Sequence, residues 1–120
     1  MFKRTIIASA VLLATSSVWA ASANNQATVA QTGNNNLATV EQIDSSNHNQ
    51  ASISQIGADN EAKTIQKNTS QSEASVAQVG AGNDALVTQE SSTAGSVAQV
   101  ASTGNFNVAT VTQQVFNEGS

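Results

Sequence analysis

The side chains that could do chemistry in this sequence are carboxylates, one histidine and many amides. The carboxylates are scattered, without the repeated pair that general acid–base catalysis needs. His48 lies alone in a polar stretch, there is no Cys for a thiolate or zinc site, and no phosphate-binding loop or nucleophile motif occurs. We therefore expect no enzyme, no cofactor and no metal site.

The amides, in contrast, recur in one motif. In Asn36-x-Ala38-x-Val40-x-Gln42 the four residues are two apart, and eight such motifs begin at intervals of 10 to 14 residues. A spacing of two is the period of a β-strand, so all four side chains share one face of the strand. The pattern predicts eight strands with amides and small apolar residues on the same inward side.

Two sets of inward positions follow from the eight motifs. The polar set, which we expect to form amide ladders, comprises Asn25, Gln31, Asn36, Gln42, Asn49, Gln55, Asn60, Gln66, Ser72, Gln78, Asn83, Gln89, Gln99, Asn107 and Gln113. The apolar set comprises Ala27, Val29, Ala38, Val40, Ala51, Ile53, Ala62, Ala74, Val76, Ala85, Val87, Val97, Ala109 and Val111. In a parallel stack each amide would lie about 4.8 Å from its equivalent and bond to it.

Glycines divide the motifs into pairs. Three motifs end in Gln-x-Gly, at Gln31, Gln55 and Gln78, whereas the motifs between them, ending at Gln42, Gln66 and Gln89, are followed by polar residues and no glycine. Glycine permits the positive φ of a tight corner, so two strands and one corner make one coil. We predict an all-β, amyloid-like β-solenoid of four strand–turn–strand coils with two parallel sheets, at about 25–48, 49–71, 72–92 and 93–115. The predicted turn glycines are Gly33, Gly57, Gly80, Gly82 and Gly104.

The first 20 residues have the pattern of a secretory signal peptide. Lys3 and Arg4 precede an apolar run over 6–14, and small residues at Val18 and Ala20 suit cleavage after Ala20, with Ala23 as a second site. The run is about half the roughly 20 residues that span a bilayer, so we expect no membrane insertion. The expected divisions are 1–20 signal peptide, 21–24 short segment, 25–115 repeat domain and 116–120 tail.

The remaining 100 residues are acidic and poor in large apolar side chains. Lys63 and Lys67 oppose eight carboxylates, which gives a net charge of −6. Nucleic acid requires a basic surface, so we exclude it as a partner. A thin Ala/Val core without disulfides stabilises an isolated monomer weakly, and stacking on another copy would compensate.

The segment Gln78-Val79-Gly80-Ala81-Gly82-Asn83-Asp84-Ala85-Leu86-Val87-Thr88-Gln89 resembles the curlin repeat, Q-x-G-x-G-N-x-A-x3-Q. The segments 31–42 and 55–66 match except at the second glycine, where Asn35 and Asp59 stand. The segment 99–113 is interpreted as a degenerate fourth copy, with two extra residues and Ala101 in place of the first glycine.

The resemblance implies a secreted bacterial subunit that polymerises into extracellular curli-type amyloid fibres for biofilm matrix and adhesion. It also implies two partners, a nucleator subunit and an outer-membrane export channel. The acidic charge favours the fibre-forming major subunit over a minor, nucleating one. A secreted β-solenoid that binds without polymerising is the remaining alternative.

Overall fold

The computed structural model describes residues 15–20, 24–43, 48–90 and 95–114, and these contain nine strands. Residues 1–14, 21–23, 44–47, 91–94 and 115–120 lie outside the described residues, and so do the parts of the predicted signal peptide, short segment, repeat domain and tail that fall on them. The strands are β1 (Thr15–Ala20), β2 (Gln26–Asn34), β3 (Leu37–Ile43), β4 (Gln50–Ala58), β5 (Glu61–Lys67), β6 (Glu73–Ala81), β7 (Asp84–Glu90), β8 (Val97–Asn105) and β9 (Val108–Gln114).

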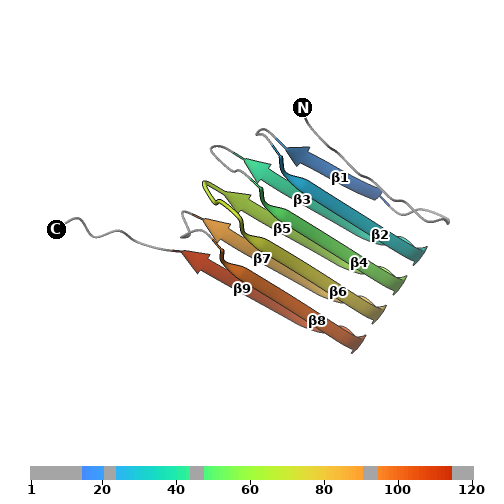
Figure 1. The fold of residues 1–120 in the computed structure, drawn as a ribbon. Coiled ribbons are helices and arrows are strands. Elements are labelled where there is room, and N and C mark those ends of the chain that lie inside the picture. Colours follow the sequence, from blue (N-terminus) through green and yellow to red (C-terminus); the bar gives the residue numbers. More distant parts are fainter. Residues whose placement is uncertain (1–14, 21–23, 44–47, 91–94, 115–120) are drawn as a thin grey trace.

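The strands form two parallel sheets. Sheet A has the order β1-β3-β5-β7-β9 and sheet B the order β2-β4-β6-β8, so the chain alternates between sheets and advances one level per strand pair (Figure 1). The pairs β2/β3, β4/β5, β6/β7 and β8/β9 are coils 1 to 4. The predicted all-β solenoid with two parallel sheets is confirmed.

Between the sheets lies a thin core of stacked small side chains. In sheet B, Ala27, Ala51 and Ala74 are in register, and so are Val29, Ile53 and Val76. Sheet A repeats the arrangement, and its buried members include Ala38, Val40 and Val87. Strict alternation of inward and outward residues therefore produces columns of like side chains, one residue per coil.

The corner after each sheet B strand is built on a column of glycines. A Cβ at Gly33, Gly57 or Gly80 would lie 1.8 Å from the carbonyl oxygen of the glycine in the next coil. All of these residues also have positive φ, between 114° and 129°. Only glycine satisfies both conditions, so this column fixes how each coil sits on the next.

The prediction for the strand of coil 4 in sheet B was wrong at Val97 and Gln99. Val97 is 55% exposed and Gln99 is also exposed, because β8 pairs with β6 so that Val76 meets Val100 and Gln78 meets Ser102. The inward residues are instead Ala98, Val100 and Ser102. The physical reason is the glycine corner, since Gly80 and Gly104 pair with each other and both have positive φ, 129° and 111°, which favours glycine at both positions and sets the register.

The strand β1 was not predicted. It lies within the expected signal peptide and pairs in parallel with β3 over six residues, Thr15 with Leu37 through Ala20 with Gln42. Cleavage of that segment stays a prediction. Within the described ranges, no helix is long and apolar enough to cross a bilayer.

Candidate functional site

A ladder of glutamine amides runs through sheet A. Each Nε2 donates to the Oε1 of the glutamine one coil further on, from Gln42 to Gln66, Gln66 to Gln89 and Gln89 to Gln113, all at 2.9 Å. The first three side chains are fully buried. The spare hydrogen on each nitrogen serves the other sheet, as in Gln66, which also donates to the carbonyl of Gln50 at 3.1 Å. The ladder thus ties the coils together and the two sheets to each other.

The equivalent ladder of sheet B is shorter. Gln31 donates to Gln55 at 2.8 Å and Gln55 to Gln78 at 2.9 Å. The register partner of Gln78 in coil 4 is Ser102, whose short side chain makes no hydrogen bond to it. The sheet B ladder therefore stops one coil before the end.

A third ladder, of asparagines, lies at the glycine corner and runs the opposite way. The Nδ2 of Asn60 donates to the Oδ1 of Asn36 at 3.0 Å, Asn83 donates to Asn60 at 2.9 Å, and Asn107 donates to Asn83 at 2.9 Å. The backbone N–H of each later asparagine donates to the same oxygen. Asparagines therefore donate toward coil 1, whereas glutamines donate toward coil 4.

The ladders end in groups that lack the partners of the inner coils. Gln42 Oε1, in coil 1, is buried and accepts no hydrogen bond within the described part of the chain. Gln113 Nε2, in coil 4, donates to the carbonyl of Val97 alone, at 2.9 Å. Asn107 Oδ1 lacks the two donors that Asn83 Oδ1 receives. The two ends of the stack thus differ in kind: each offers what the other lacks.

The backbone also has open edges. In the described residues, β8 and β9 have a neighbouring strand on one side only, as does β2. We call the side of coil 4 formed by β8 and β9 the C-terminal face, and the side of coil 1 formed by β2 and β3 the N-terminal face. Large apolar residues are exposed on coil 4, including Phe106 at 81% and Val108 at 78%. Edges of this kind are templates for another strand.

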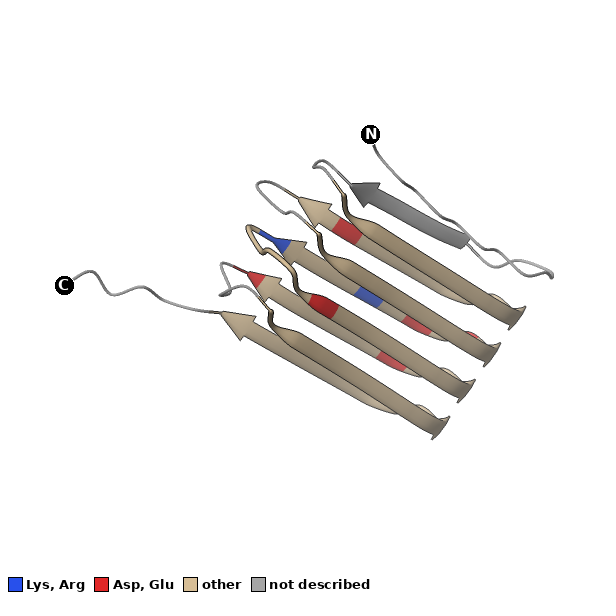
Figure 2. Ribbon diagram, in the orientation of Figure 1, with Lys and Arg blue, Asp and Glu red and all other residues tan. Residues whose placement is uncertain are grey.

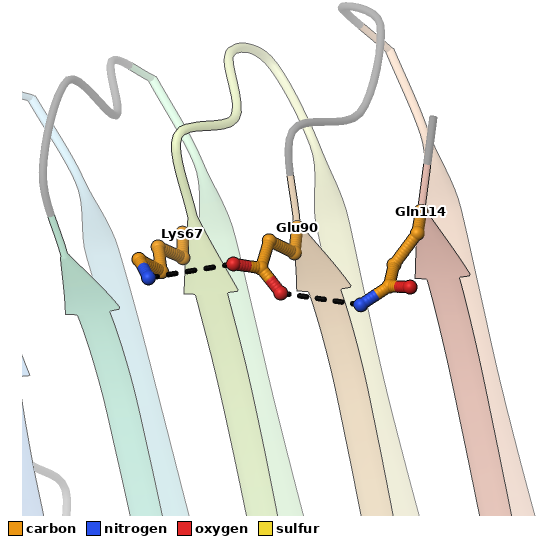
Figure 3. A network of polar contacts seen from close by, with 3 residues as sticks. All are labelled: Lys67, Glu90 and Gln114. Atoms are coloured by element: carbon orange, nitrogen blue, oxygen red, sulfur yellow. Dashed lines mark hydrogen bonds and ion pairs between the residues drawn. The ribbon is translucent and has the colours of Figure 1, made fainter. Parts of the chain in front are cut away.

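The outer surfaces of the two sheets carry different charges. The charged residues of sheet A are on β3, β5 and β7, whereas Glu73, at the start of β6, is the only one on the strands of sheet B (Figure 2). At the end of the sheet A strands, Lys67 Nζ lies 3.3 Å from Glu90 Oε1, and Gln114 Nε2 donates to Glu90 Oε2 at 3.2 Å (Figure 3). The amides and charges thus repeat the vertical pairing of the core on the surface.

Most of the residues expected to face inward do lie inside. Among the polar set, the structure buries Asn25, Gln31, Asn36, Gln42, Asn49, Gln55, Asn60, Gln66, Ser72, Gln78, Asn83 and Gln89. Asn107 and Gln113, in the last coil, are half-buried. Ser102 was not predicted, although the coil length indicates it: Glu73 pairs with Val97, 24 residues on, as Gln26 pairs with Gln50.

The site is therefore a stack of polar ladders with complementary ends. The residues described include no group of three His, Cys, Asp or Glu that could hold a metal ion. Architecture of this kind is typical of structural repeat proteins.

One family model, the curlin associated repeat, matches residues 23–43. These residues include β2 and β3, the whole of coil 1. The match confirms the resemblance to the curlin repeat over these residues. Coils 2 and 3 follow coil 1 in register, with glutamine on glutamine and glycine on glycine. No curated protein and no solved structure matches the chain.

Proposed function

We propose that this protein is a secreted, non-enzymatic structural subunit that self-assembles into extracellular, curli-type amyloid fibres of a biofilm matrix. The observation that carries the proposal is the complementarity of the two ends of the solenoid. It is supported by the curlin associated repeat in coil 1 and by the two parallel sheets.

Stacking the C-terminal face of one copy on the N-terminal face of the next would continue the glutamine ladder of sheet A and the asparagine ladder. Gln113 Nε2 would donate to Gln42 Oε1 of the next copy, as Gln89 donates to Gln113 within one chain. Asn36 of the next copy would donate to Asn107 Oδ1, as Asn107 donates to Asn83. Stacking two identical faces would not do this. Two N-terminal faces would bring the acceptor Gln42 Oε1 of one copy against the same acceptor of the other, and two C-terminal faces would bring the donor Gln113 Nε2 against the same donor.

Such a contact joins different faces and does not close on itself. Heterologous contacts of this kind give open filaments unless a rotation closes them into a ring. The open edges of β8 and β9 supply backbone groups for the joint, and burial of Val108 against Leu37 of the next copy would add apolar contact. The joint would thus repeat the contacts between coils inside the chain.

The family resemblance supports two further parts of the proposal, a nucleator subunit and an outer-membrane export channel as partners. The net charge of −6 after residue 20 supports the role of major subunit. A minor, nucleating role remains the second candidate and has a clear signature. A nucleator should shorten the lag of a partner subunit at a low molar ratio, whereas a major subunit should elongate on its own seeds.

The test is assembly of a chain of residues 21–120, followed by thioflavin fluorescence, sedimentation and fibre diffraction. We expect sedimentable, dye-positive fibres with a meridional reflection near about 4.8 Å. A chain that stays soluble and dye-negative, even when seeded with its own sonicated product, would overturn the proposal.

A pair of glycine variants tests the joint itself. In the isolated chain a Cβ at Gly104 meets only Asn107 Nδ2, at 3.5 Å, but Gly33 of a docked copy would occupy the position that Gly104 has over Gly80. We expect Gly104→Ala to fold and to block elongation. Gly95→Ala is the matched control, because Gly95 also has positive φ while its equivalents, Asn24, His48 and Gln71, carry side chains. Equal elongation of both variants would exclude this joint.

A further inference from the structure

The strand β1 occupies one half of the N-terminal face. It adds to the free edge of β3 in parallel, with Val18 opposite Val40 and Ala20 opposite Gln42. In sheet B, β2 has no such neighbour among the described residues. The N-terminal face is therefore closed over sheet A and open over sheet B (Figure 1).

The place that β1 fills is the one that β9 of a second copy would need. Within the chain, Val87 pairs with Val111 and Gln89 with Gln113. Continuing that register across the proposed joint brings Val111 of a second copy to Val40, and its Gln113 to Gln42. Those positions are held by Val18 and Ala20, so β1 and a second copy compete for the same backbone groups.

The match between β1 and this place is incomplete at one position. Ala20 stands where the ladder calls for a glutamine, and alanine has no amide to donate. The acceptor opposite it, Gln42 Oε1, is buried without a hydrogen-bond partner. A buried acceptor left unpaired is unfavourable, so the β1 segment fills the edge without completing it.

We propose that residues 15–20 form an intramolecular cap that closes the N-terminal face to a second copy until the segment is removed or displaced. This inference rests on the proposed function. Cleavage after Ala20, or after Ala23, removes the whole of β1. Displacement by β9 of a second copy would give Gln42 Oε1 the amide of Gln113 that the cap cannot supply.

The cap acts on one end only, because β8 and β9 stay open in the capped chain. A capped chain can dock its C-terminal face on the N-terminal face at the end of a fibre. It then presents its own closed face and stops growth there. At the opposite end of the fibre it cannot add at all. The uncleaved chain is thus a terminator of one fibre end.

The experiment compares the full chain with residues 21–120 on fragments of fibres grown from residues 21–120. A cap closed in nine of ten molecules lowers the apparent affinity about tenfold, so we expect roughly tenfold slower elongation by the full chain. The variant Val18→Pro with Trp19→Pro keeps the length of the segment but cannot pair as a strand, and should restore elongation. Ala20→Gln should slow elongation further, because it supplies the missing amide.

Amide hydrogen exchange on the soluble chains gives a readout that needs no fibre. Backbone N–H groups of Ala38 to Gln42 that face β1 should exchange faster in the double proline variant than in the full chain. Growth by residues 21–120 together with equal growth and equal exchange in the full chain and the proline variant would overturn the cap alone. Failure of residues 21–120 to grow would instead overturn the proposed fibre.

Discussion

The two sheets of this solenoid have the same topology but differ in how completely their ladders are built. In sheet A the glutamine ladder passes through all four coils, from Gln42 to Gln113. In sheet B it stops at Gln78, and the strands instead end in the glycine column. Sheet A is held together by side-chain amides, whereas the corner of sheet B is held by close backbone approach. Register in this fold thus has two independent sources.

The largest expected effect comes from the glycine column. Gly80→Ala would place a Cβ 1.8 Å from the carbonyl oxygen of Gly104, at a φ of 129°. Neither backbone can move without opening the coil. We therefore expect the free energy of unfolding to fall by more than about 4 kcal/mol and coils 3 and 4 to lose their cooperative unfolding transition. Circular dichroism during denaturant titration measures it. Thr88→Ala, on the outer side of sheet A, is the control and should change stability by less than about 0.5 kcal/mol.

The ladders can be compared directly by removing one glutamine from each. Gln66→Leu leaves Gln89 Oε1 without its donor and takes an acceptor from Gln42, so we expect a loss of about 3 kcal/mol. Gln78→Leu interrupts only the end of the sheet B ladder, where Gln55 Nε2 still donates to the carbonyl of Leu37. The free energy of unfolding should therefore fall by only about 1 kcal/mol. Unfolding midpoints in urea decide between them. Equal losses would show that the completeness of a ladder does not matter.

Thr64 is an irregularity in the apolar column of sheet A. It lies in register between Val40 and Val87, fully buried, and its hydroxyl has no hydrogen-bond partner in the described structure. Thr64→Val removes that unpaired hydroxyl without changing the shape of the side chain, so we expect the free energy of unfolding to rise by about 1–2 kcal/mol. Val87→Thr is the mirror experiment and should lose a similar amount. A neutral Thr64→Val would mean that the hydroxyl is satisfied by water.

Completing the shorter ladder should also stabilise. Ser102→Gln places an amide opposite Gln78, one coil beyond the present end of the sheet B ladder. A net hydrogen bond contributes about 0.5–1.5 kcal/mol, and the urea midpoint should rise accordingly. Gln99→Ser, on the exposed side of the same strand, is the control and should have no effect. A loss of stability in Ser102→Gln would indicate that coil 4 has no room for the longer side chain.

The surface pairs should contribute least. Lys67 and Glu90 are 42% and 35% exposed in their side chains, and exposed ion pairs contribute about 0–1 kcal/mol. We expect Glu90→Gln to change the unfolding free energy by less than about 0.5 kcal/mol, and the change to vanish in high salt. Glu73→Gln is the reference, because the Glu73 carboxylate makes no ion pair with any residue that the structure describes. A larger loss from Glu90→Gln would make the charged column part of the framework.

The strands were predictable because Ala, Val and the amides recur at every second residue, which is the period of a β-strand. The prediction for β8 was wrong because Gln99 fits the motif's glutamine position, although the coil length and Gly104 indicate Ser102. The glycine constraint is a close approach between coils, which a single-sequence pattern of amides does not show. β1 was missed for a different reason, since Thr15–Ala20 lacks the motif and pairs through its backbone.

The near-constant coil has a consequence for the material that the chain would make. Register partners lie 23 or 24 residues apart, and each coil advances by one strand spacing, about 4.8 Å. The mass of a filament per unit length is then set by the coil and not by the subunit. A variant that duplicates the whole of coil 2 would lengthen each subunit by one layer while leaving both faces and the filament's cross-section unchanged. Subunits with different numbers of coils could therefore join in one filament without changing its cross-section or its spacing between coils.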